Sequence, residues 1–163
     1  FEAKVGFVFV VLVLTFAVGV WRVADGRRRL RVAALLLGLF AVNGIIWGLF
    51  PMQQRGNEMA ATDVAHIIGA IAQVLTILLF IAFGSGAGGR GFRRFSIGLA
   101  LAILGAGSLA GTRSGQIAAG GPTPYIGLIE RVSFYGPSLW ILALAILLLR
   151  QQRGAPGAGG SKA

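Results

Sequence analysis

Cysteine is absent from this 163-residue chain, histidine occurs once, and charged residues make up only 12% of it. Without cysteine, the chain can form neither a disulfide framework nor a thiolate metal site. The single histidine, His66, excludes sites that need two or more imidazoles, such as H-E-x-x-H. A soluble domain carries about a quarter of its residues as charges. A chain this poor in charge is therefore predicted to be an integral membrane protein.

Acidic residues are fewer than basic ones: the chain has five Asp and Glu, fifteen Lys and Arg, and a net charge of +10. In a soluble protein this excess would suggest binding to nucleic acid. Here most basic residues lie in short segments between apolar runs, which is the pattern of topology signals and lipid headgroup contacts. We therefore expect membrane lipids as partners, allow for other membrane subunits, and expect no nucleic acid.

Long apolar runs are what the chain does contain. A bilayer core about 30 Å thick needs roughly 20 helical residues. Five runs come close to this length, at residues 5–21, 32–50, 64–83, 95–111 and 125–149. They are apolar on every side, whereas the strands of a membrane barrel alternate apolar and polar residues. The prediction is an all-α fold, a polytopic transmembrane helical bundle with five visible spans over residues 1–150.

The polar residues between the runs predict where each helix begins and ends. Pro51 ends the second run, and Thr62-Asp63 is a plausible N-cap for the third. A kink is expected at Gly136-Pro137 in the last run. The tail, residues 151–163, has no apolar residues that could order it, so we predict a disordered basic tail.

The distribution of charge predicts which way the chain crosses the membrane. Eleven basic residues fall in the segments 22–31 and 90–94 and in the segment that follows the last run, while four of the five acidic residues fall on the other side. The positive-inside rule places the basic segments and the C-terminus in the cytoplasm. The excess of Arg over Lys, with much Gly and Ala, indicates a GC-rich bacterial gene, so the membrane expected is the inner membrane of a bacterium. Five spans that end inside must begin outside, so we expect a sixth span upstream of Phe1; a natural five-span protein is the alternative.

Two amides are expected near the middle of the membrane on consecutive helices. At 1.5 Å per residue, Asn43 lies about 17 Å and Gln73 about 15 Å above the inner boundary. An interhelical amide hydrogen bond is the simpler interpretation. A polar lining for a substrate or proton path is the functional alternative.

Four ionisable residues are expected near the outer boundary. His66 lies about 26 Å and Glu130 about 28 Å above the inner boundary. Asp63 shares a helix face with His66, and Arg131 follows Glu130. We predict one polar cluster of Asp63, His66, Glu130 and Arg131 that faces the bundle interior and has a structural or gating role. Metal binding and acid–base catalysis are the alternatives, but the pattern predicts no metal, no cofactor and no assigned catalytic residue.

Small residues form a ridge on the fourth run, where Gly98, Ala102, Ala106 and Ala110 recur every four positions. Small residues let membrane helices approach closely. The second run has Gly44 and Gly48 at the same spacing. We therefore expect the second and fourth helices at the centre of the bundle, with a homodimer face as the alternative.

Several short motifs together resemble a known bacterial membrane family, domain of unknown function 998. They are Phe16-Ala17-Val18-Gly19, Gly48-Leu49-Phe50-Pro51, His66 at the start of the third run, Glu130-Arg131, and Trp140. The resemblance covers almost the whole chain and implies a six-span membrane bundle without an established activity. Members commonly carry an acidic residue soon after the Phe-Pro pair, where this chain has Met52 and Gln53.

Three functions remain open on this basis. The leading interpretation is a non-enzymatic helical bundle that acts as a structural or accessory subunit. The alternative is a small transporter or channel whose path passes Asn43, Gln73 and His66. The third is a membrane-embedded lipid-modifying enzyme that uses His66 and Glu130.

Overall fold

The computed structural model describes residues 2–52 and 60–154, and within them the fold is all-α, as predicted. The long helices are α1 (Glu2–Val23), α2 (Arg28–Gly48), α3 (Ala61–Gly84), α4 (Arg90–Thr112) and α6 (Ile126–Gly154). A 3-10 turn, η1 (Ser85–Ala87), and a short helix, α5 (Ser114–Ala118), lie between them. All five long helices are long and apolar enough to cross a membrane. The predicted membrane bundle is confirmed.

The helices extend beyond the apolar runs at their charged ends. α4 begins at Arg90, ahead of the run that starts at residue 95, and α6 continues to Gly154, past the boundary predicted at residue 150. The remainder of the predicted tail, residues 155–163, lies outside the described residues. α6 also continues without a break through Gly136 and Pro137, which are both buried.

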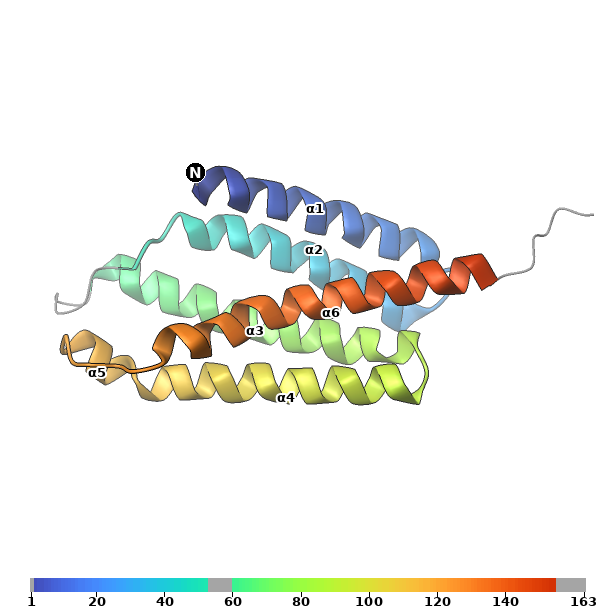
Figure 1. Ribbon diagram of the computed structural model, residues 1–163. Coiled ribbons are helices and arrows are strands. Elements are labelled where there is room, and N and C mark those ends of the chain that lie inside the picture. Colours follow the sequence, from blue (N-terminus) through green and yellow to red (C-terminus); the bar gives the residue numbers. More distant parts are fainter. Residues whose placement is uncertain (1, 53–59, 155–163) are drawn as a thin grey trace, which may run out of the picture.

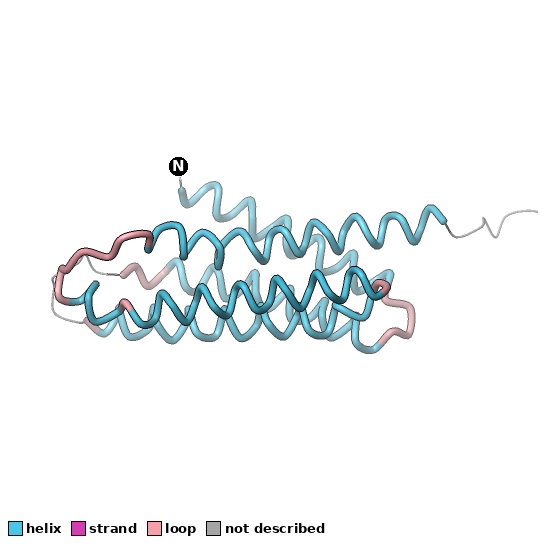
Figure 2. Tube along the Cα trace, turned by 60° about the horizontal axis from the view of Figure 1, so that its bottom comes forward, coloured by secondary structure: helices cyan, strands magenta, loops and turns pink. Residues whose placement is uncertain are grey.

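The long helices run side by side along one axis. α2 packs against α1 and α3, and α4 packs against α3 and α6. In Figure 1, α1 to α4 follow one another in chain order, and α6 crosses in front of this row. The turned view in Figure 2 shows the same long helices with the connecting loops gathered at the two ends.

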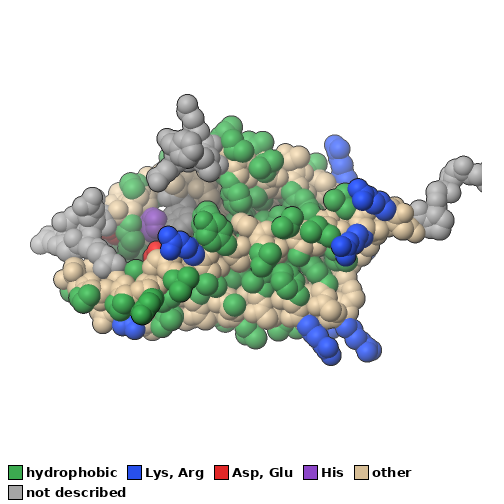
Figure 3. All heavy atoms as spheres, in the orientation of Figure 1, with side chains coloured by type: hydrophobic (Ala, Val, Ile, Leu, Met, Phe, Trp, Pro, Cys, Tyr) green, Lys and Arg blue, Asp and Glu red, His purple; other side chains and the backbone are tan. Residues whose placement is uncertain are grey.

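One end of the bundle, which we call the basic end, carries the α1–α2 turn, η1, the start of α4 and the end of α6. The side chain of Gln151 joins these segments, because its amide donates to the carbonyl of Ala87 at 2.8 Å and accepts from the guanidinium of Arg27 at 3.5 Å. Lys and Arg side chains gather at this end in Figure 3, while hydrophobic side chains cover the middle. The three segments predicted to share one side of the membrane therefore meet in space.

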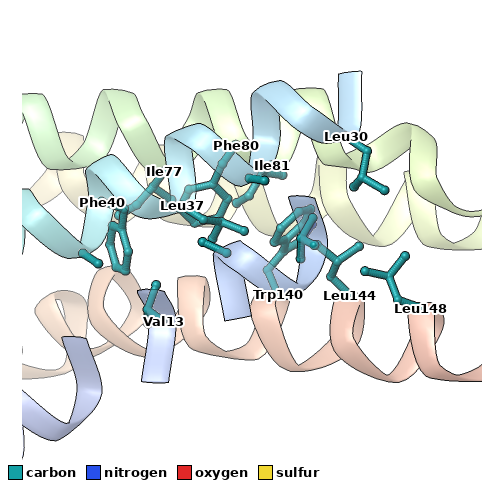
Figure 4. Packing of buried hydrophobic residues seen from close by; sticks show 14 of the residues in the cluster. Val13, Leu30, Leu37, Phe40, Ile77, Phe80, Ile81, Trp140, Leu144 and Leu148 are labelled. Carbon is teal, nitrogen blue, oxygen red and sulfur yellow. The ribbon is translucent and has the colours of Figure 1, made fainter. Parts of the chain in front are cut away.

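The core is closed by a chain of aromatic rings to which every long helix contributes one. Ring centroids are 6.3 Å apart for Phe9 and Phe40, 5.6 Å for Phe40 and Phe80, 5.3 Å for Phe80 and Trp140, and 5.9 Å for Trp140 and Phe92. Figure 4 shows three of these side chains, Phe40, Phe80 and Trp140, among the buried hydrophobic residues. Such contacts are favourable beyond the area that they bury.

The middle of this aromatic chain allows little movement. Phe80 and Trp140 are completely buried, and the indole nitrogen of Trp140 donates a 2.9 Å hydrogen bond to the hydroxyl of Ser96. Gly84 packs directly against the indole ring: a Cβ at Gly84 would lie 2.9 Å from Cζ2 of Trp140 and closer still to Cη2. The glycine is therefore required for α3 and α6 to approach one another here.

The expectation that α4 occupies the centre is wrong. Only 11% of its spanning window is buried, against 22–33% for the other four spans. Gly98 and Ala102 are exposed, and a Cβ at Gly98 would meet nothing within 4 Å. α4 instead packs through the face that carries Ser96 and Ile103, because α6 offers Gly136 opposite Ile103. The first half of the small-residue ridge, Gly98 and Ala102, lies off this face, whereas Ala106 and Ala110 are half-buried.

Candidate functional site

Asn43 and Gln73, the predicted midplane pair, are brought together. The amide nitrogen of Asn43 donates to the side-chain oxygen of Gln73 at 2.6 Å and to the carbonyl of Gly69 at 3.2 Å. The amide nitrogen of Gln73 donates to the carbonyl of Phe40 at 3.3 Å. Both side chains thus connect α2 to α3, and each makes two hydrogen bonds.

The inward face of α3 becomes more polar away from the basic end. Phe80, Gln73 and His66 are seven residues apart and therefore lie on one face of the helix. Phe80 is completely buried, Gln73 is buried and His66 is half-buried. The bundle interior consequently changes from a closed aromatic core to a partly accessible polar surface.

His66 connects the start of α3 to the end of α2. Its Nδ1 lies 2.7 Å from the carbonyl oxygen of Phe50, so the ring nitrogen donates and the carbonyl accepts. Phe50 follows the last turn of α2, where the carbonyl groups lack partners within the helix. His66 supplies one such partner from the neighbouring helix.

Asp63 helps to begin α3, but the predicted cap at Thr62-Asp63 is wrong in register. The N-cap is Ala60, and the carboxylate of Asp63 accepts from the backbone N–H of Ala60 at 2.8 Å. Because Ala60 has no side chain that can cap the helix, the carboxylate in the first turn takes over part of that role. A negative charge is favourable at this end of a helix dipole.

Glu130 and Arg131 lie on the outside of α6. Both side chains are exposed, so the expectation that they face the bundle interior is wrong. Neither has a hydrogen bond or ion pair to any residue in the described part of the chain, including His66. The inward face of this part of α6 is formed instead by Ile129 and Ser133.

The side chain of Arg131 runs back along its own helix. A Cβ at Gly127, one turn earlier, would lie 3.8 Å from a guanidinium nitrogen of Arg131. This direction carries the charge toward the end of the bundle, as expected for a basic side chain near a membrane boundary. The four predicted residues therefore separate into Asp63 and His66 on α3 and an exposed pair on α6.

Over residues 2–52 and 60–154, no group of three or more potential ligand side chains is arranged to hold a metal ion. Within the same residues, the buried hydroxyls of Thr62 and Ser133 have no hydrogen-bond partner. Two polar contacts were not predicted: the bond from Trp140 to Ser96 and the bridge made by Gln151. Neither position has a distinctive local pattern, because both contacts join segments that are far apart in the chain.

Comparison with known families gives one match. A family model described as "Protein of unknown function (DUF998)" matches residues 5–147, which include most of every long helix. The match does not bear on the additional span expected upstream. No curated protein and no solved structure matches the chain.

Proposed function

This chain belongs to the DUF998 family, and from that premise we propose that it is a non-enzymatic helical bundle that acts as a structural or accessory subunit in a bacterial inner membrane. In this proposal the basic end and the C-terminus face the cytoplasm. The ten described arginines at the basic end, with Asp25 as the only acidic residue there, support this orientation under the positive-inside rule.

The closed core is the observation that carries the proposal. One aromatic ring from each long helix joins a continuous chain across the bundle. Phe80 and Trp140 in this chain are completely buried. Close packing of this kind favours a rigid scaffold, because a transport path needs a wet interior.

The midplane amides support the same function. Asn43 and Gln73 bond to one another and to backbone carbonyls. Polar side chains in membrane bundles commonly hold helices together in this way. α4, the least covered span, provides a surface on which a larger membrane complex could form contacts.

Site-specific photocrosslinking in cells tests the accessory role. A photoreactive residue at Leu101 on α4 is compared with one at Leu12 on α1, since the two side chains are almost equally exposed, at 63% and 62%. We expect an adduct with one discrete membrane protein from Leu101 and no protein adduct from Leu12. If both positions react with lipid alone, the protein acts by itself and the accessory role is excluded.

A small transporter or channel is the second candidate. The graded polarity along α3, from His66 to Gln73, is the observation that favours it. Proton and potassium flux in proteoliposomes separates the two functions: a scaffold gives the flux of protein-free vesicles, whereas a transporter gives a higher flux that changes in Asn43→Leu. His66 and Glu130 make no hydrogen bond or ion pair with each other, so their geometry does not support an enzyme that uses this pair.

A further inference from the structure

An open groove lies at the basic end between α2 and α3. Its volume is about 260 Å³, and it is lined by Arg29, Ala82 and Phe83. Arg29 belongs to the first turn of α2, and Ala82 and Phe83 belong to the last turn of α3. All three side chains are exposed. The groove therefore combines one cation with an apolar wall at the point where two membrane spans end.

Two arginines near Arg29 in the sequence, Arg27 and Arg31, interact with the protein itself. Arg27 donates to the carbonyls of Val23 and Ala24, and Arg31 lies over the ring of Trp21, 5.6 Å from its centroid. Arg29 has no hydrogen bond or ion pair with any described residue. Its guanidinium group is available to a ligand.

The surroundings favour an anionic ligand. The basic end contains ten described arginines and one acidic residue, Asp25. Clustered basic residues at a membrane boundary attract anionic lipids, each contributing about 1 kcal/mol near the surface. The charge brings anions to this end, and the groove provides one defined place for them.

We propose that this groove binds an anionic phospholipid. The guanidinium of Arg29 takes the phosphate, since its planar donors match a phosphate group in two parallel hydrogen bonds. The first part of an acyl chain lies against Ala82 and Phe83. A free phosphate would leave this apolar wall uncovered, so the geometry points to a lipid. The inference does not depend on the accessory role proposed above.

Thermal unfolding of the purified full-length protein in a neutral detergent tests the site. Tryptophan fluorescence reports unfolding while phosphatidylglycerol or phosphatidylcholine with the same acyl chains is added. We expect phosphatidylglycerol to raise the melting temperature in a saturable way and phosphatidylcholine to have little effect. Arg29→Gln should raise the half-saturating concentration about tenfold, the loss expected for one charge-assisted contact.

Two further variants separate the groove from general surface charge. Arg94→Gln removes another exposed arginine from the same end but outside the groove, so it should retain the wild-type response to phosphatidylglycerol. Ala82→Leu fills the groove without changing the charge. It should weaken stabilisation by phosphatidylglycerol, as Arg29→Gln does.

Three results would overturn the proposal. If Arg29→Gln and Arg94→Gln weaken the response to phosphatidylglycerol equally, the lipid is attracted to the charge of the whole basic end and not to the groove. Equal stabilisation by both lipids would mean that the headgroup is not recognised. If inorganic phosphate alone raises the melting temperature by the same amount, the ligand is a free anion. A lipid-free melting temperature like that of the wild type shows that each variant is folded.

Discussion

Individual glycines control how closely the helices of this bundle approach one another. Gly84 is the last residue of α3 and Gly44 lies within α2, and the two have different surroundings. A Cβ at Gly84 would overlap the indole of Trp140, whereas a Cβ at Gly44 would meet nothing within 4 Å. The same substitution should therefore have different effects at the two positions.

Gly84→Ala is expected to destabilise the protein by about 1–3 kcal/mol, the usual cost of adding a carbon to a packed core. The indole is completely buried and bonded to Ser96, so it cannot move aside freely. Thermal unfolding in detergent measures the effect. Gly44→Ala is the matched control and should leave the melting temperature unchanged or slightly raised. If both variants lower the melting temperature equally, the contact with Trp140 does not limit packing.

The amide pair can be tested at the same scale. Asn43→Leu leaves the side-chain oxygen of Gln73 without its donor, and Gln73→Leu leaves Asn43 with one acceptor, the carbonyl of Gly69. In the double variant both polar groups are gone. The losses of stability in the two single variants should therefore sum to more than the loss in the double variant. The difference should be about 0.6–1.7 kcal/mol, the contribution of an interhelical hydrogen bond in a membrane.

A double-mutant cycle on the free energy of unfolding in mixed micelles measures this coupling. The cycle Thr15→Ala with Gln73→Leu is a control, because the hydroxyl of Thr15 bonds only within α1, to Val11. Simple additivity for Asn43 and Gln73 would mean that their hydrogen bond contributes nothing to stability.

At the scale of whole elements, α4 shows that composition and position in a bundle are separate properties. It contains the most regular small-residue ridge, yet it is the span with the least buried surface. Its attachment depends on Ile103, which is completely buried against Gly136 of α6.

Ile103→Ala should cost at least about 2 kcal/mol, the lower part of the range for removing a buried isoleucine side chain. The lower part applies because lipid solvates apolar groups better than water does, so mainly packing is lost. Ala102→Leu, one residue earlier, adds carbons to an exposed position and should change stability little. Comparing the melting temperatures of the two variants in detergent checks the orientation of α4. If Ala102→Leu is the more destabilising variant, the small-residue ridge packs against another helix.

The turns at the basic end show how separate elements are held together. Gln151 in the last turn of α6 bonds to η1 and to Arg27 in the α1–α2 turn. These bonds connect the part of α6 beyond its apolar run to the rest of the basic end. They also hold together three basic segments that would otherwise repel one another.

At the scale of the whole molecule, the proposed orientation has a direct test. The chain has no cysteine, so a single introduced cysteine reports one position. Met52→Cys lies at the end opposite the basic end, and Gln152→Cys lies at the basic end; both side chains are exposed.

On intact cells, an impermeant thiol reagent should label Met52→Cys and should label Gln152→Cys only after the membrane is permeabilised. The charge difference between the two ends is the physical reason, since segments rich in arginine remain in the cytoplasm. Labelling of Gln152→Cys alone on intact cells would invert the orientation.

The fold class and the approximate limits of five helices follow from the order of residues alone. A long run of apolar residues has no favourable place in water, and in lipid its backbone must form its own hydrogen bonds. The residue order also places Asn43 and Gln73 at the same depth in the membrane, because the rise along a helix depends only on residue number.

Which side of each helix faces the protein depends on how the helices pack together. Lipid and a bundle interior are both apolar, so hydropathy does not separate a lipid-facing surface from a buried one. For this reason Gly98 and Ala102 of the small-residue ridge were expected inside and are exposed. Glu130 and Arg131 were expected inside because an unpaired charge is costly in lipid, yet they are exposed near the end of the bundle. The rotation of each helix follows from the fit of particular side chains, such as Trp140 against Gly84, and this fit exists only when the helices are assembled.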